Sequence, residues 1–194
     1  MLQRLLALLR RIFGIESGED RNVTSLYLHV ALQYHVAGRS AFFADSFPVS
    51  GNLFHHAIEM MLKYSLMEKD YSPQSLRMKY RHDLKTLWRE YKKTSKNGAL
   101  AAYDSVINGL NPVEELRYPW RSYIFTMGLR KGPDQPFTGP ATRGIKQYHL
   151  TVEEVDELMS ALLLANDVNP EWVKGRLRGE ATEQYQRENF HRFI

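Results

Sequence analysis

Apolar residues recur at intervals of three and four along most of this chain, a spacing that predicts helices with one buried face. The first long stretch of this kind covers residues 23–45, where Leu26, Val30, Ala37 and Ala41 mostly follow helical spacing. We therefore expect a long helix over this stretch.

A second helix is predicted to follow Phe47-Pro48. Proline is well tolerated in the first helical turn, because the N–H that it lacks would have no partner there. The apolar positions behind it lie at i, i+4, i+7, i+8 and i+11, the pattern of one buried face: Leu53, Ala57, Met60, Met61 and Tyr64.

Shorter helices are predicted in the middle of the chain. Ser72-Pro73 favours a helix start, and apolar residues at i, i+3, i+4 and i+7 predict an amphipathic helix over residues 83–93. A similar pattern predicts another helix over residues 100–110. The apolar face of the amphipathic helix holds Leu84, Leu87, Trp88 and Tyr91. We expect both aromatic side chains in the core rather than on a ligand surface.

The helical pattern breaks over residues 117–150, where residues 130–144 alone hold three glycines and three prolines. This composition predicts a long irregular loop. Within it, residues 122–126 (SYIFT) resemble a lone strand with no clear partner. The helical signal returns at Thr151, which forms a capping-box pattern with Glu154. A last helix is predicted from Trp172 to about residue 189.

The sequence therefore predicts an all-α protein, an up-and-down bundle of about five to seven helices with a long irregular loop near 117–150. We divide the chain into a basic amphipathic helix and linker at 1–22, the bundle at 23–168 and a helical extension at 169–194. For residues 2–13 we favour packing on the bundle over contact with a membrane surface, because so short a helix is marginal in water. No segment approaches the roughly 18 apolar residues of a membrane span.

Composition adds two constraints. The chain of 194 residues holds no cysteine, which excludes thiolate metal sites and cysteine nucleophiles within it and favours a reducing, cytoplasmic setting. The net charge is +4, but the charge is unevenly placed. Residues 77–96 hold eight basic and two acidic side chains, so this segment carries +6 and the rest of the chain carries −2.

Three separated segments, 53–63 (LFHHAIEMMLK), 81–88 (RHDLKTLW) and 115–119 (ELRYP), resemble the HEPN domain family (higher eukaryote and prokaryote nucleotide-binding) in order and approximate spacing. The family patterns are H-A-x-E-x-x-L-K, G-H-D-L-x-x-L and R-Y-P, and Arg81 stands where the second pattern often has glycine. The resemblance covers about residues 24–165. It implies an up-and-down helical bundle that often dimerises and binds nucleotide or RNA.

The resemblance also implies a candidate activity, since active members of the family resemble metal-independent endoribonucleases with an arginine and a histidine four to six residues apart. Two pairs satisfy this spacing, Arg77 with His82 and Arg143 with His149. A histidine can move the proton of a 2′-hydroxyl near neutral pH, and an arginine can stabilise the phosphorane charge. However, the number of arginines and histidines predicts roughly 1.7 such pairs by chance, so the spacing does not by itself favour catalysis.

One alternative is a metal site. His55 and Glu59 lie at i, i+4 and share a helical face, which suits two metal ligands. His29 and His35 would add donors if they faced that pair. Glu59 can instead form an i, i+4 ion pair with Lys63, which we favour. We therefore expect no metal and no cofactor.

The basic residues carry the preferred hypothesis. Lys85, Arg89, Lys92 and Lys96 recur at i, i+4, i+7 and i+11 and, with Arg81, form a basic stripe that suits phosphate groups. A charged stripe is often only the solvated face of a helix, but this one is entirely basic. We predict a homodimeric binding or accessory protein for RNA, nucleotide or an acidic partner protein. The alternatives are an endoribonuclease and a structural protein–protein interaction module.

Overall fold

The computed structural model describes residues 18–117, 123–128 and 146–168 and confirms the all-α fold. The described part holds α2 (Gly18–Phe43), α3 (Phe47–Met67), α4 (Pro73–Tyr80), α5 (Leu84–Ser95), η1 (Gly98–Tyr103), α6 (Asp104–Leu110), η2 (Asn111–Arg117) and α7 (Val152–Leu164), where η marks a 3-10 helix. Two strands, β1 (Tyr123–Gly128) and β2 (Lys146–Thr151), complete it. The helices predicted at 2–13 and 172–189 lie outside the described residues.

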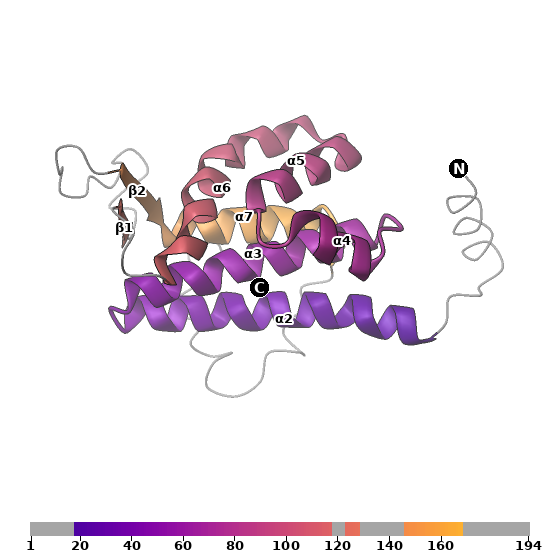
Figure 1. The fold of residues 1–194 in the computed structure, drawn as a ribbon, viewed down its shortest axis with the longest axis horizontal. Coiled ribbons are helices and arrows are strands. Elements are labelled where there is room, and N and C mark those ends of the chain that lie inside the picture. Colours follow the sequence, from indigo (N-terminus) through magenta and orange to yellow (C-terminus); the bar gives the residue numbers. More distant parts are fainter. Residues whose placement is uncertain (1–17, 118–122, 129–145, 169–194) are drawn as a thin grey trace.

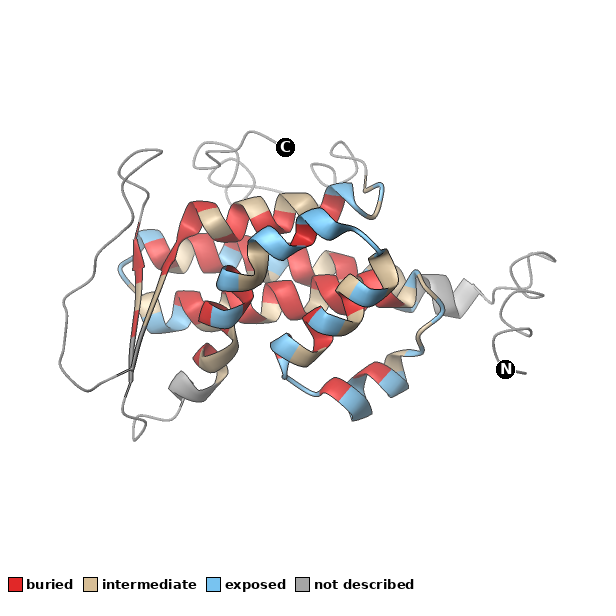
Figure 2. Cartoon of the chain, turned by 90° about the horizontal axis from the view of Figure 1, so that it is seen from above, coloured by how far each residue is buried: buried red, intermediate tan, exposed pale blue. Residues whose placement is uncertain are grey.

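Helix α3 is the central element of the bundle. It lies beside α2 along most of its length, and the two are joined by a turn of three residues (Figure 1). Helices α4, α5, α6 and α7, together with η2 and β1, also contact α3. The buried residues gather along the facing sides of these helices (Figure 2). A side chain on α3 can therefore meet residues from almost every other part of the bundle.

Local sequence signals set the helix starts as predicted. Pro48 lies in the first turn of α3, and Ser72 caps α4 by accepting a hydrogen bond from a backbone N–H three residues on. Asp83 caps α5 in the same way. Thr151 and Glu154 form a full capping box at the start of α7. Each side chain satisfies a backbone donor that the helix itself leaves without a partner.

The hydrophobic faces were predicted with mixed success. On α5 all four apolar positions are buried, and both aromatic residues, Trp88 and Tyr91, lie in the core as expected. The helix predicted at about 23–45 is present as α2, but of the four apolar positions at helical spacing two are exposed and two are half-buried. The observed buried face of α2 holds Leu28, Ala31, Leu32, His35, Val36, Arg39 and Phe42. Two polar residues, His35 and Arg39, interrupt the apolar repeat of this face, which explains why apolar spacing alone does not reveal it.

The prediction of a lone strand was wrong, since β1 pairs with β2 in parallel. Their register places Phe125 opposite Tyr148. A parallel partner must lie a crossover away in sequence, so local pattern could not reveal it. Two ends of the predicted 117–150 loop are therefore strands, and residues 118–122 and 129–145 lie outside the described part. The sheet packs on α3 at Gly51, where a Cβ would lie 2.6 Å from the Phe125 ring.

Among the described residues, no helix is both long and apolar enough to cross a membrane.

Candidate functional site

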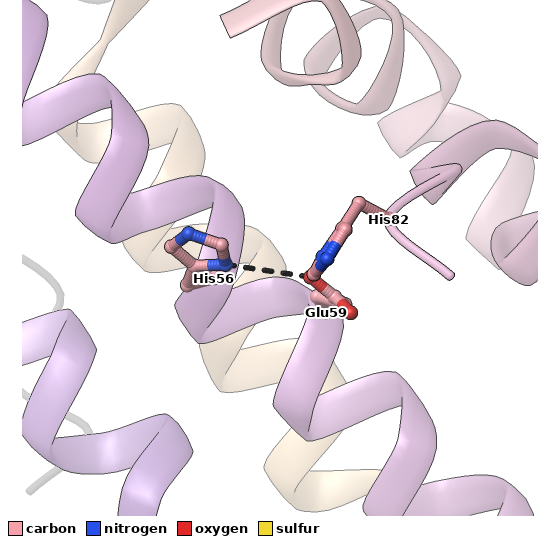
Figure 3. A group of neighbouring side chains, drawn as sticks. All are labelled: His56, Glu59 and His82. Atoms are coloured by element: carbon pink, nitrogen blue, oxygen red, sulfur yellow. Dashed lines mark hydrogen bonds and ion pairs between the residues drawn. The ribbon is translucent and has the colours of Figure 1, made fainter. Parts of the chain in front are cut away.

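Three residues from distant parts of the chain converge beside α3. His56 and Glu59 project from α3, and His82 reaches them from the turn between α4 and α5 (Figure 3). His55 on α3 and Glu114 on η2 border the same group. We call these five residues the histidine cluster.

The turn between α4 and α5 positions His82. The carbonyl of Tyr80 accepts a hydrogen bond of 2.8 Å from the N–H of Asp83, which closes a four-residue turn. Arg81 takes the second position of this turn with φ 47° and ψ −111°. These angles are those of a type II′ turn, a region that glycine adopts freely and other residues rarely do. The turn thus brings the His82 side chain towards α3, and the next residue, Asp83, caps α5.

Glu59 is fully buried at the centre of the cluster. Its Oε2 lies 3.1 Å from His82 Nδ1 and 3.4 Å from His56 Nδ1. Lys63 donates to Oε1 of the same carboxylate and, over 3.1 Å, to the carbonyl of Arg81. Burial raises the pKa of Glu59, but hydrogen bonds from His56, Lys63 and His82 together with the lysine charge lower it to about 2. The predicted pairing of Glu59 with Lys63 is confirmed.

His55 is fully buried, and its two ring nitrogens have different surroundings. Nδ1 lies 3.0 Å from the carbonyl oxygen of Leu110, which can only accept, so Nδ1 carries the proton. Nε2 lies 3.8 Å from Glu59 Oε2 and 3.9 Å from Glu114 Oε2, beyond hydrogen-bond distance of both. Burial lowers the pKa of His55, which favours the neutral ring with a lone pair on Nε2.

The arrangement supports two kinds of chemistry. A buried carboxylate that orients an exposed imidazole can support proton transfer at that imidazole, and His82 has 54 % of its side chain exposed. Imidazole nitrogens and a carboxylate oxygen within a few ångströms of one another can also hold a divalent metal ion. The sequence singled out His55 with Glu59, but His56 and His82 are the residues that make close contact with Glu59. His35, considered as a further donor, contacts Asp156 instead.

Of the two candidate catalytic pairs, both residues of Arg77/His82 are described by the structure, but only the histidine of Arg143/His149 is. Arg77 is exposed on α4, and among the interactions of the described residues no hydrogen bond or ring contact joins its side chain to His82. Arg143 lies outside the described residues. His149 is half-buried on β2, where its Nδ1 lies within hydrogen-bond distance of the Thr126 hydroxyl. Strands β1 and β2 lie at the end of the bundle away from α4, so His149 and His82 belong to separate regions (Figure 1).

The predicted basic stripe is largely exposed. Arg81, Lys85, Arg89 and Lys96 are exposed, and none of them has a carboxylate within salt-bridge distance in the described part of the chain. Lys92 differs, because its ammonium group lies 2.6 Å from Asp104 Oδ1 on α6. Its charge is therefore already compensated.

A second buried polar group lies between α2 and α7, and the sequence did not reveal it. Arg39 donates to Asp156 Oδ2, and His35 Nε2 lies 2.9 Å from Asp156 Oδ1. All three side chains are buried. The only signal in the sequence was the i, i+4 spacing of His35 and Arg39, and nothing in it pointed to a partner 117 residues away.

Comparison of this chain with protein-family models, with curated proteins and with solved structures finds no match. The residues of the site are therefore interpreted from their own geometry.

Proposed function

We propose that this chain is a HEPN-like helical binding protein that engages RNA through the exposed basic stripe of α5. The observation that carries the proposal is the exposure of Lys85, Arg89 and Lys96, none of which has a carboxylate within salt-bridge distance among the described residues. Arg89 donates a hydrogen bond to the Thr86 hydroxyl, and its charge helps to lower the pKa of Asp83. Cations held in this state are available to phosphate groups, and the counterions released on contact favour binding.

The construction of α5 supports this role. Its opposite face is anchored in the core by four buried apolar residues, and Asp83 fixes its first turn. The stripe is therefore presented by a helix of fixed orientation. Lys92 is left out of the proposed contact surface, because Asp104 already compensates it.

The backbone at Arg81 supports the family resemblance. Arg81 occupies the position at which the HEPN pattern often has glycine, and its φ of 47° lies in the region that favours glycine. The position at which the HEPN pattern often has glycine is thus the position at which the turn requires a positive φ. The resemblance also implies a homodimer, which light scattering of the purified chain would test.

The test compares two double variants with the same change in charge. Lys85→Gln/Arg89→Gln removes two charges from the stripe. Lys69→Gln/Lys79→Gln removes two charges outside it, from the α3–α4 connection and from α4, where Lys69 lies over the Tyr91 ring and Lys79 lies over the Tyr80 ring, 3.9 Å from Glu90. Binding to a fluorescent single-stranded RNA is measured over a series of salt concentrations. In the stripe variant, the slope of the logarithm of the RNA association constant against the logarithm of the salt concentration should become shallower by about 1.4. Each phosphate contact on a single strand contributes about 0.7 to this slope, and the variant removes two.

The control variant should keep the slope of the unmodified protein. Equal slopes for the two double variants would mean that net charge, and not the stripe, drives binding. If the unmodified protein binds an acidic polypeptide at low salt but does not bind RNA, RNA binding is refuted and an acidic protein is the partner that the stripe favours.

A second candidate is a metal-independent endoribonuclease, favoured by one observation: His82 is exposed and its Nδ1 faces the buried Glu59 carboxylate. Such a pair would let His82 accept the proton of a 2′-hydroxyl, with the carboxylate stabilising the charged ring. If the protein is an endoribonuclease, it should cleave RNA in the presence of EDTA, and His82→Ala should abolish the cleavage. Absence of cleavage over a range of RNA sequences would reject it.

A further inference from the structure

We propose that His56, Glu59 and His82 form a binding site for a divalent transition-metal ion, zinc above all. One ligand atom from each of these three residues lies within 4.8 Å of the other two. The residues come from α3 and from the turn that precedes α5, so an ion here would tie the turn to the central helix (Figure 3).

The donor spacing is already close to what zinc requires. Zinc bonds of 2.0–2.1 Å to nitrogen or oxygen in a tetrahedral site place neighbouring donor atoms about 3.3–3.4 Å apart. Glu59 Oε2 lies 3.4 Å from His56 Nδ1 and 3.1 Å from His82 Nδ1. Only small side-chain movements would therefore be needed to seat an ion between these atoms.

His55 provides an independent indication. Its Nε2 is buried and has no hydrogen-bond partner among the described residues. Because Nδ1 donates to the Leu110 carbonyl, Nε2 presents a lone pair, and this lone pair lies 3.8 Å from Glu59 Oε2. A lone pair facing a carboxylate oxygen is unfavourable in a buried site unless a cation or a proton donor lies between them. A metal ion bound to Glu59 Oε2 would place positive charge beside the His55 lone pair and reduce this conflict.

The outer contacts of the cluster are also those of a metal site. Ligating histidines usually donate their second ring N–H to a carbonyl or a carboxylate, which orients the ring. His55 does so to Leu110. The Nδ1 atoms of His56 and His82 point at Glu59, so metal binding at these atoms moves their protons to Nε2. Nε2 of His56 lies 3.9 Å from Glu114 Oε2, which is an electrostatic contact but longer than a hydrogen bond. Lys63 holds Oε1 of Glu59 and leaves Oε2 for the ion.

The donor types select the class of metal. Magnesium and calcium prefer oxygen ligands, whereas imidazole nitrogens suit zinc and its neighbours in the first transition row. A set with two imidazoles and one carboxylate therefore fits zinc, for which this three-ligand combination is known.

The experiment uses the full chain without an affinity tag, freed of metal with a chelator, and zinc titrated against a chromophoric competitor. We expect one zinc ion per chain. His82→Ala should weaken zinc binding at least about tenfold, because it removes a ligand from a small set. His29→Ala, which removes a histidine of α2 outside the cluster, should bind zinc as the unmodified protein does. Magnesium should not compete, and cobalt should give the visible absorption of a tetrahedral site.

His82 is exposed at a turn, so its loss should leave the fold intact, and circular dichroism checks this. His56→Ala is the second variant and should weaken zinc binding as well. The proposal is overturned if the unmodified chain binds no zinc at micromolar concentration, or if both variants bind it as tightly as the unmodified chain. The titration contains no RNA, and Lys85→Gln/Arg89→Gln should retain full zinc affinity, so the outcome is independent of the proposed RNA binding.

Discussion

Replacing Arg81 with glycine should make this protein more stable. The side chain of Arg81 is exposed, and its backbone lies at φ 47° and ψ −111°. A residue with a Cβ in such a region costs roughly 1–3 kcal/mol. Glycine avoids that cost but adds about 0.5–1 kcal/mol of chain entropy to the unfolded state. The expected net gain in the free energy of unfolding is about 0–2.5 kcal/mol, measured by urea denaturation.

Arg81→Ala is the matched control, because it removes the same charge and the same long side chain but keeps the Cβ. It should leave the free energy of unfolding within about 0.5 kcal/mol of the unmodified protein, as expected for an exposed site. The hydrogen bond from Lys63 to the carbonyl of residue 81 persists in both variants, since it uses only backbone of the turn. If the glycine variant is no more stable than the alanine variant, the turn does not have the type II′ geometry on which the position of His82 depends.

Three further predictions concern the bundle. Asp156→Ala leaves buried Arg39 without the carboxylate to which it donates, and should lower the free energy of unfolding by about 3–5 kcal/mol in urea denaturation. Gly51→Ala should destabilise the protein by about 1–3 kcal/mol, because its Cβ would meet the aromatic ring that packs there from β1, whereas Gly98→Ala, with open space around it, serves as the control. Hydrogen bonds from a lysine and an indole lower the pKa of Asp104 below its usual 3.8. The stability that the ionised Asp104 adds is therefore present above pH 3.8 and is lost as the pH falls through the pKa of the folded protein. In urea denaturation, the difference in free energy of unfolding between the unmodified protein and Asp104→Asn should shrink between pH 7 and pH 3.

The sequence predicted the parts of the fold that depend on neighbours along one helix. Pro48 and the capping box at Thr151 act within a single turn, and the pairing of Glu59 with Lys63 spans one turn of α3. The buried face of α5 follows from four apolar residues with no polar interruption. Contacts within one helical turn or along one helix face depend on residues at fixed short spacings, which is why the sequence predicted them.

Contacts between distant segments were not predictable in the same way. Lys92 belongs to the basic stripe by spacing, and only the fold brings Asp104 against it. His82 was selected through a nuclease spacing, whereas its observed partner is Glu59, 23 residues earlier on α3. The buried face of α2 was missed because Arg39 and His35 belong to the core only once Asp156 on α7 is in place. In each case the deciding partner is a polar residue that periodicity cannot assign.

The cost of the histidine cluster is itself an argument for a role at the turn between α4 and α5. A buried carboxylate and ammonium lose hydration that their attraction only partly restores, and apolar residues of similar volume are often no less stable in such positions. Glu59 and Lys63 therefore add little stability that a hydrophobic pair could not supply. What a hydrophobic pair could not do is hold the Arg81 carbonyl and the His82 ring, since both contacts need hydrogen bonds. The two buried charges thus fix the geometry of the turn from which α5 and its basic stripe begin, and that geometry is the feature shared by the proposed metal site and the proposed RNA surface.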